Sequence, residues 1–406
     1  CVEMDGQQAV IDRLRASFRS GISLPEQFRL GQLKALLTLV TDNEQQILEA
    51  LQKDLAKPKF EAILSEVDMV INELSYTISH LKSWMAPEYV EKNLECYAVI
   101  CGGIEETKKL LENRFDHIFY TGSQAVGRSV LQAAAVHLTP VTLELGGKCP
   151  CLMYGKLDIQ AAAKRLVWAK FFNAGQSCVA PDYVLCNRQT CEALVPALRQ
   201  ALEAFYGQRP RECDDMGRIV SQKHCARLVS LLERSTGKVV IGGETDKEEK
   251  YIAPTVLVDV KETDALMEEE IFGPILPIIS IDTLADAISF VNAREKPLAL
   301  YVFSDESKVV HTVLEQTSSG GFCSNDGIVH MCLPGLPFGG VGNSGMGSYH
   351  GRWGFETFSH RRACMLRGWG LERVNVLRYP PYTESNLGWL RWATGARRQG
   401  WGCSVM

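Results

Sequence analysis

Apolar residues recur at helical spacing in three stretches near the start of the chain. The first predicts a helix over residues 7–19, with Asp5 as its N-cap and Gly21 as the residue that stops it. The second predicts a helix over 30–40, and the third predicts a long helix over about 60–84. Stripes of this kind face a hydrophobic core, so we assign them no chemistry.

From residue 96 onward, short β-rich runs alternate with helical segments. The expected strands cover 96–101, 117–120, 141–145, 183–186, 238–241, 275–281 and 298–303. This alternation predicts an α/β fold with parallel strands. The chain has 406 residues, more than a single core usually organises, so two large lobes are expected.

Composition narrows the functional class. Hydrophobic residues make up 46% of the chain and charged residues 22%, which is ordinary globular usage. The net charge of −5, without a basic stripe, argues against a nucleic-acid partner. Fourteen scattered cysteines with no signal peptide before them indicate reduced thiols in the cytoplasm.

Two further classes of site are not expected. Cys149-Pro-Cys151 and the group of Cys323, His330 and Cys332 do not match zinc-ligand spacing, so no metal is predicted. No apolar run approaches the ~20 residues that a membrane-spanning helix needs.

A glutamate and a cysteine carry the clearest chemical signal. Glu144 lies in Val-Thr-Leu-Glu-Leu-Gly-Gly-Lys (141–148), and Cys178 follows 34 residues later in Phe-Phe-Asn-Ala-Gly-Gln-Ser-Cys-Val-Ala-Pro (171–181). A thiol attacks a carbonyl but leaves a stable thioester, which a nearby carboxylate can hydrolyse by activating water. A single cysteine is more often a buried structural thiol. Glycines beside both residues favour the catalytic interpretation, because they allow a substrate to approach the main chain closely.

These two motifs resemble the active-site signatures of the aldehyde dehydrogenase superfamily. Residues 268–274 resemble its nicotinamide-side motif, 121–127 its pyrophosphate-contacting turn, and 337–345 its late catalytic-domain loop. The short N-terminus, the 378–382 stretch and the tail look like the class 3 branch, subfamily B, which acts on medium- and long-chain fatty aldehydes. The resemblance implies a Rossmann-type nucleotide domain, an α/β catalytic domain and a small oligomerisation arm.

The resemblance also implies roles for single residues. Cys178 would attack the aldehyde while its own backbone N–H steadies the oxyanion, NAD or NADP would take the hydride, and Glu144 would deprotonate the hydrolytic water. Glu270 would anchor the nicotinamide-side ribose and Phe272 would pack beside it. The residues expected to bind the cofactor phosphates are Gly122, Ser123, Gln124, Ala125, Val126 and Gly127.

Local patterns distinguish that phosphate-binding turn from a second glycine-rich segment. The turn at 121–127 follows a predicted strand and precedes a helical segment, 128–137, which is the geometry that offers backbone N–H groups to an anion. Residues 340–345 formally match the dinucleotide fingerprint but lack that strand and helix, so we interpret them as a chance match.

The chain departs from the family between Leu94 and Glu95. Two expected motifs are missing there, Pro-Trp-Asn and Lys-Pro-Ser-Glu, together with about two βαβ units of ~30 residues each. The expected domains are therefore a truncated NAD(P)-binding domain (1–147), a catalytic domain (148–350) and a C-terminal oligomerisation segment with a lipidated tail (351–406). Three functions stay open: a dehydrogenase, a Cys178 esterase that works without cofactor, and a non-catalytic membrane-tethered interaction protein.

The tail predicts attachment to a membrane. Cys403-Ser-Val-Met406 matches a prenylation box, with a disordered tail carrying a spare thiol as the alternative. A second signal could come from Arg391, Arg397 and Arg398 with neighbouring tryptophans. We expect a homodimer at the cytoplasmic face of membranes or lipid droplets, and in the cytoplasm. At the other end of the chain, Met4 is the expected initiator.

Overall fold

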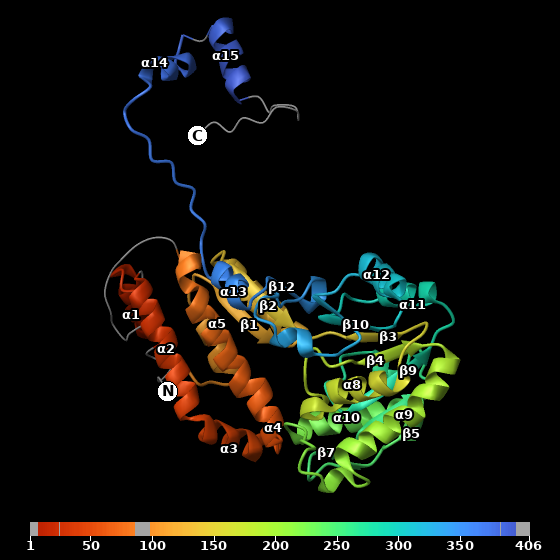
Figure 1. Ribbon diagram of the computed structural model, residues 1–406. Coiled ribbons are helices and arrows are strands. Elements are labelled where there is room, and N and C mark those ends of the chain that lie inside the picture. The colour runs from red at the N-terminus through yellow and green to blue at the C-terminus, as the bar shows by residue number, and fades with distance from the viewer. Residues whose placement is uncertain (1–6, 24, 86–97, 382, 395–406) are drawn as a thin grey trace. The chain divides into compact units, whose positions relative to one another are not determined.

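The computed structural model of the protein describes residues 7–23, 25–85, 98–381 and 383–394 (Figure 1). Residue contacts divide the chain into two units, Cys1–Ser359 and His360–Met406, and each is described by itself. The division into three domains stays a prediction. Within the described residues, no helix is long and apolar enough to cross a bilayer.

Helices occupy the N-terminal part of the first unit. Helix α1 (Gln7–Arg19) has the predicted bounds, whereas Asp5 lies outside the described residues. The predicted helix over 60–84 is confirmed, although a π-helical turn interrupts it. The N-terminal series continues with α2 (Glu26–Asp42), α3 (Glu44–Leu55), α4 (Lys59–Ala62), the π turn η2 (Ile63–Val67) and α5 (Asp68–Met85).

A three-stranded sheet follows these helices. Strand β2 (Val141–Leu145) pairs in parallel with β1 (Ile118–Gly122) and antiparallel with β12 (Gly345–Met346). Helix α6 (Ile104–Leu111) precedes the sheet, and α7 (Gln124–Val136) packs on β1 and β2.

The predicted strand over 96–101 is wrong. Residues 98–101 form no strand, and Val99 is 73% exposed. A strand needs a neighbour for its backbone N–H and C=O groups, and the outer edge of β1 pairs with no described strand.

A seven-stranded sheet forms the larger part of the first unit, in the order β11-β10-β3-β4-β9-β8-β5. Neighbouring strands are parallel except β5 and β8, so the predicted parallel α/β fold is confirmed. The strands are β3 (Pro150–Met153), β4 (Tyr183–Cys186), β5 (Lys238–Ile241), β8 (Thr255–Val258), β9 (Ile275–Ser280), β10 (Ala299–Phe303) and β11 (Gly321–Ser324).

Helices cover both faces of this sheet. Figure 1 shows α8 (Ile159–Phe171), α9 (Arg188–Tyr206) and α10 (Gln222–Arg234) on one side, and α11 (Leu284–Asn292) with α12 (Ser307–Gln316) on the other. Polar caps start several of them: the side chains of Asp158, Asn187, Ser221 and Thr283 accept hydrogen bonds from first-turn N–H groups. Shorter elements complete the unit: η3 (Phe172–Gly175), η4 (Pro210–Glu212), β6 (Thr245–Asp246), β7 (Tyr251–Ile252), η5 (Ala265–Met267), η6 (Val329–Cys332), η7 (Gly342–Ser344) and α13 (Gly351–Thr357).

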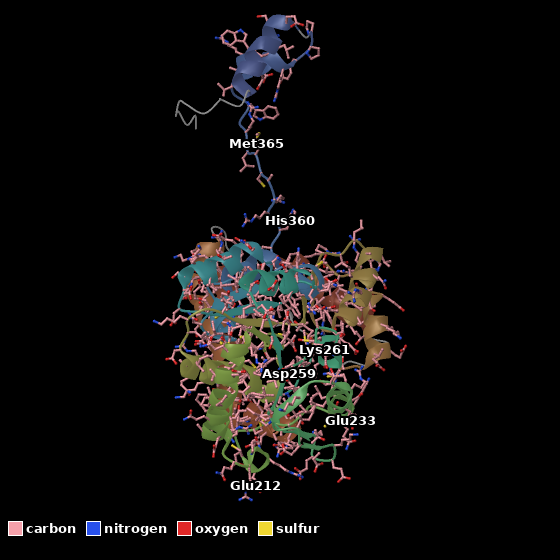
Figure 2. All side chains as sticks on the ribbon, turned by 90° about the vertical axis from the view of Figure 1, so that its right-hand side faces the viewer. Glu212, Glu233, Asp259, Lys261, His360 and Met365 are labelled. Carbon is pink, nitrogen blue, oxygen red and sulfur yellow. The ribbon has the colours of Figure 1, made fainter. Side chains whose placement is uncertain are left out.

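Burial separates the interior from the surface. Apolar side chains of the seven-stranded sheet and its helices form one continuous core, whereas charged residues such as Glu212, Glu233 and Lys261 lie at the surface (Figure 2). The second unit contains α14 (Glu372–Asn375), η8 (Val376–Arg378) and α15 (Glu384–Thr394). Its Met365, labelled in Figure 2, is 82% exposed.

Candidate active site

Glu144 and Cys178 meet in the first unit. Glu144 lies on β2, between Thr121 of β1 and Gly345 of β12 in the sheet register. Cys178 lies in the turn between η3 and β4. The Cys178 and Thr121 side chains both lie against the Glu144 carboxylate, close enough to alter its pKa. Two residues 34 positions apart in the sequence are therefore in direct contact.

Burial sets the protonation of this pair. Glu144 is only 2% exposed, and its Oε1 atom has no hydrogen-bond partner among the described residues. Burial raises the pKa of Glu144, while the neighbouring Cys178 and Thr121 side chains lower it in part. Burial also raises the pKa of the Cys178 thiol well above its usual value, and the charge on Glu144 raises it further. The arrangement therefore favours a neutral thiol beside a carboxylate that can take its proton.

The backbone on either side of Cys178 is held by buried side chains. The Cys149 thiol donates to the Cys178 carbonyl, with 3.4 Å between Sγ and O. The Tyr301 hydroxyl donates to the Val179 carbonyl at 2.6 Å. Cys149 and Tyr301 are both fully buried, so the turn rests on the core of the seven-stranded sheet.

Asp182 links this turn to the segment that carries Glu270. Its carboxylate accepts hydrogen bonds from the backbone N–H groups of Ile271 at 2.9 Å and Cys149 at 3.3 Å. The Lys148 Nζ lies 4.0 Å from the same carboxylate and donates to the carbonyls of Leu266 and Glu269. Asp182 was not predicted from the sequence, although an acid directly after the cysteine motif is a usable signal.

A second buried cation lies near Asp182. Lys170 is fully buried, and its Nζ has no hydrogen-bond partner among the described residues. Burial lowers the pKa of Lys170 to about 8, and the Asp182 carboxylate opposes that shift. Two lysines and one aspartate thus form a cluster of charges behind the cysteine turn.

Glu270 and Phe272 belong to the motif that is predicted from the sequence to hold the nicotinamide end of a cofactor. A Cβ on Gly146 would lie 2.0 Å from the Glu270 Oε2 atom, so only glycine allows this approach. The other oxygen, Oε1, is buried without a hydrogen-bond partner among the described residues, and burial raises the pKa of Glu270 to about 8. Phe272 has a left-handed backbone (φ 51°) and is 38% exposed. An unpaired acceptor beside an exposed ring fits a ribose and a flat heterocycle.

The turn at 121–127 leads from a strand into a helix, as predicted. Thr121 and Gly122 still belong to β1, and Ser123 caps α7 by accepting a bond from the Val126 N–H at 3.4 Å. Ala125 and Val126 are exposed at the helix N-terminus, and Gly127 packs against Leu145. The Gln124 amide donates to the Gly146 carbonyl at 3.0 Å. The turn therefore lies beside Gly146, which is in close contact with the Glu270 carboxylate.

The loop at 337–345 also reaches the site. It forms η7 and then β12, with no helix after its glycines, so the fingerprint match at 340–345 is a chance one as predicted. Gly345 approaches β2 so closely that a Cβ would lie 2.1 Å from the Leu143 carbonyl oxygen. Tyr349 was not predicted from the sequence. Burial raises its pKa, and the charges of Glu144 and Cys178 raise it further, so Tyr349 lies near this pair.

The remaining predicted sites have different outcomes. Cys403 lies outside the described residues. The described residues contain no group of three or more metal-ligating side chains, and Cys323 and Cys332 are free thiols. His330 has two unpaired ring nitrogens within the described part of the chain, and burial lowers its pKa to about 4.

Comparison with known proteins identifies the family. Residues 95–364 match the model of the family described as "Aldehyde dehydrogenase family". The chain belongs to the aldehyde dehydrogenase family. Among curated relatives, rat aldehyde dehydrogenase family 3 member B1 is 46% identical over 95% of this chain and 96% of its own length. Rat family 3 member A2 is 41% identical over 93% of this chain and 92% of its own. These relatives place the chain in the class 3 branch.

Solved structures agree with this aldehyde dehydrogenase fold. A substrate-bound AldH from Staphylococcus aureus superimposes with a TM-score of 0.87 at 34% identity, covering 95% of this chain and 99% of the other. A Mycobacterium tuberculosis aldehyde dehydrogenase complexed with NAD+ gives a TM-score of 0.60 at 32% identity, covering 72% of this chain and 60% of the other.

Proposed function

We propose that this aldehyde dehydrogenase scaffold oxidises medium- and long-chain aliphatic aldehydes to carboxylic acids, with NAD or NADP as cofactor. The close approach of the Cys178 thiol to the Glu144 carboxylate is the observation that carries this proposal. It joins a nucleophile to a base, the minimum that thioester formation and hydrolysis need.

The pair acts in two stages. Glu144 takes the thiol proton as Cys178 Sγ bonds to the aldehyde carbon, and the backbone N–H of Cys178 donates to the oxyanion. Glu270 and Phe272 would hold NAD(P), which would supply the hydride acceptor for oxidation of the adduct to a thioester. Glu144 releases the thiol proton to solvent and then removes a proton from water, so that the water oxygen attacks the thioester carbon. The Cys178 thiolate leaves and takes this second proton back from Glu144. Burial raises the pKa of Glu144, which makes its carboxylate a stronger base. A stronger base is suited to both proton transfers.

Four features support a cofactor beside this pair. Glu270 would hold the ribose, Phe272 would cover the nicotinamide, and the exposed first turn of α7 would face the phosphates. The related Mycobacterium tuberculosis enzyme was solved in complex with NAD+, which supports NAD as the cofactor.

The chain is shorter than its relatives, and for this reason we expect it to bind the cofactor weakly. The alignment with the rat B1 relative spans 453 positions, whereas 95% of 406 residues is about 386, so about 67 positions face no residue of this chain. Because the Cys178–Glu144 contact does not depend on those positions, a cofactor-free esterase at Cys178 is the second candidate function. It needs only the nucleophile, the oxyanion N–H and the base.

We also propose a membrane location, through prenylation of Cys403. The described residues 360–381 and 383–394 support it, because they contain six arginines and two glutamates. Leu366 is 97% exposed and Trp369 is fully exposed, so apolar and cationic groups both face solvent there. Membrane fractionation of wild type and Cys403→Ser tests this, and equal cytosolic recovery would contradict it. A homodimer is proposed from the family resemblance, and sedimentation of the purified chain checks it.

Two variants test the chemistry once the missing segment is restored between Leu94 and Glu95. Cys178→Ala should abolish both dehydrogenase and esterase turnover, because no other group forms the covalent bond. Glu144→Gln should accumulate an acyl-enzyme, because the thiol can also lose its proton to water, whereas hydrolysis of the thioester needs Glu144 as base. Peptide mass spectrometry after incubation with a long-chain aldehyde and NAD(P) locates the acyl group. An adduct on another cysteine, or full turnover by Cys178→Ala, would overturn the proposal.

A further inference from the structure

The loop before Cys178 has an unfavourable backbone. Asn173 (φ 52°), Ala174 (φ 53°) and Gly175 (φ 73°) are all in the left-handed region. Only glycine adopts this conformation without a steric penalty, and an L-alanine there is strained. A run of three such residues persists only where surrounding contacts hold it.

One of those contacts comes from the N-terminal helices. The Asn173 backbone N–H donates to the Glu61 Oε2 atom at 2.7 Å, across 112 positions of sequence. Glu61 lies on α4 and is 8% exposed. The bond is made to the first left-handed residue of the loop, five positions before Cys178. No part of the Cys178–Glu144 chemistry uses Glu61.

The surroundings of Glu61 are buried and charged. Lys57 is 2% exposed, pairs with Glu66 and lies over the Phe172 ring at 5.8 Å. Three titratable groups interact electrostatically with Glu61. They are Lys57, Asp215 and Tyr206, the last residue of α9. Burial raises the pKa of Glu61 to about 7, while the Asn173 bond and Lys57 lower it in part. The protein therefore retains a costly buried carboxyl at this position.

The end of the loop is tied to the same helical region by a second route. Gln176 donates to the Arg218 carbonyl at 2.9 Å and accepts from the Val220 N–H at 2.8 Å. The Arg218 N–H in turn donates to the carbonyl of Leu55, the last residue of α3, at 2.9 Å. Residues 55–61 thus contact the loop directly at its start and through one intermediate segment at its end.

We propose that Glu61 is a positioning residue, which accepts the Asn173 N–H and thereby holds the loop so that Cys178 reaches Glu144. Glu61 acts through the backbone and does not touch the substrate. This inference rests on the proposed role of Cys178 as nucleophile. It predicts that the acceptor oxygen, rather than the bulk of the side chain, is what the loop requires.

Two nearly isosteric variants separate these possibilities. Glu61→Gln keeps an acceptor oxygen, whereas Glu61→Met fills the same space without one. We expect Glu61→Met to speed hydrogen exchange at the Asn173 amide at least tenfold and to raise iodoacetamide labelling of Cys178 severalfold, because the released thiol leaves Glu144. Glu61→Gln should restore most of both values. Exchange is read at single-residue resolution, and labelling by peptide mass spectrometry.

Glu306→Ala is the matched control. The Glu306 Oε1 atom accepts the Lys156 N–H at 3.0 Å, a carboxylate–amide bond spanning 150 residues. This bond lies beyond the carboxyl ends of β3 and β10, whereas Cys178 precedes the amino end of β4. Because these strands are parallel, the bond and Cys178 are at opposite ends of the strands. We expect this variant to leave Asn173 exchange and Cys178 labelling unchanged. A melting curve for each variant identifies any that fails to fold.

Two results would overturn the proposal. One is wild-type exchange and labelling in folded Glu61→Met, and the other is a Glu61→Gln variant that behaves as Glu61→Met does. Either outcome is distinct from failure of the nucleophile assignment. If Cys178→Ala kept full acyl transfer, exchange at Asn173 would still report whether Glu61 holds the loop.

Discussion

The two sheets of the first unit differ in how completely they are built. In the seven-stranded sheet, β3, β4 and β10 are buried at every residue. In the three-stranded sheet, β1 is an edge strand with no fully buried residue. Beside it, α7 exposes Val136 (76%), and Leu138 directly after α7 is 89% exposed. Unpaired strand edges and exposed apolar side chains mark a surface that lacks a neighbour.

The residues proposed for covalent chemistry and those proposed for cofactor binding have different surroundings. Cys178 is supported by the complete sheet, through Cys149, Tyr301 and Asp182. Glu144 lies on β2, the one strand of the small sheet with a neighbour on each side. The incomplete edge is on the far side of β1, where the relatives' additional residues are expected. Cys178 and Glu144 therefore lie among well-packed neighbours, whereas the outer edge of β1 pairs with no described strand.

The largest expected effect comes from completing the small sheet. Inserting the corresponding segment of the rat B1 relative between Leu94 and Glu95 should strengthen NAD(P) binding by at least a hundredfold, because it would supply a neighbour for the open edge of β1. Isothermal titration calorimetry measures this. Micromolar binding by the uninserted chain, with a sharp cooperative melt, would show that the nucleotide side is already sufficient.

Matched leucine truncations compare the stability of the two regions. Leu152 of β3 is 1% exposed, and Leu152→Ala should lower the free energy of unfolding by about 2–5 kcal/mol. Leu111 of α6 is only partly buried beside the small sheet, and Leu111→Ala should cost less than half as much. Urea denaturation gives both values. Equal losses would mean that the two regions unfold as one equally packed core.

A pH profile tests the electrostatics of the pair. The negative charge of Glu144 adds to the rise in the pKa of Cys178 that burial causes. Removing that charge in Glu144→Gln should lower the thiol pKa, so thiolate-dependent alkylation of Cys178 should begin at a lower pH than in wild type. Iodoacetamide labelling followed by peptide mass spectrometry measures the midpoint, with Glu306→Gln as control. A midpoint that stays in place or rises would contradict the contact.

The smallest expected effect concerns the end of α7. Leu138 adopts φ 53° where its N–H bonds to Ala135 and the Thr139 N–H bonds to Ala134, an arrangement that favours glycine. Because Leu138 is also exposed, Leu138→Gly should stabilise the chain by about 1 kcal/mol and reduce aggregation. Thermal melts and light scattering check both. A lower melting temperature would mean that Leu138 packs against something in solution.

Much of the fold could be predicted from the sequence, because local pattern and tertiary environment agree there. The bounds of β2, β4 and β5 follow from runs of β-rich residues, and α1 follows from its apolar stripe. Strand β3 was missed because Cys149-Pro-Cys151 has weak strand propensity and is recruited by its neighbours on both sides. The prediction of a strand over 96–101 was wrong for the opposite reason. Its local pattern favours a strand, but residues 98–101 have no described strand to pair with.

The candidate site divides in the same way. Glu144, Cys178 and Glu270 stand in recognisable motifs, so their positions could be named from the sequence. Asp182 and Glu61 act on backbone N–H groups far away in the chain, and only the fold shows which ones. The roles of all these residues stay predictions until they are tested.

The most direct test asks whether the covalent pair works without the nucleotide side. The Glu144→Gln variant of the 406-residue chain, given p-nitrophenyl acetate and no cofactor, should retain an acetyl group on Cys178, detected by peptide mass spectrometry. Wild type should release it, and Cys178→Ala should show no label on the 171–181 peptide. Absence of the acetyl group from Cys178 in Glu144→Gln, or equal labelling of exposed cysteines such as Cys101 and Cys364, would contradict a preserved and specific catalytic pair.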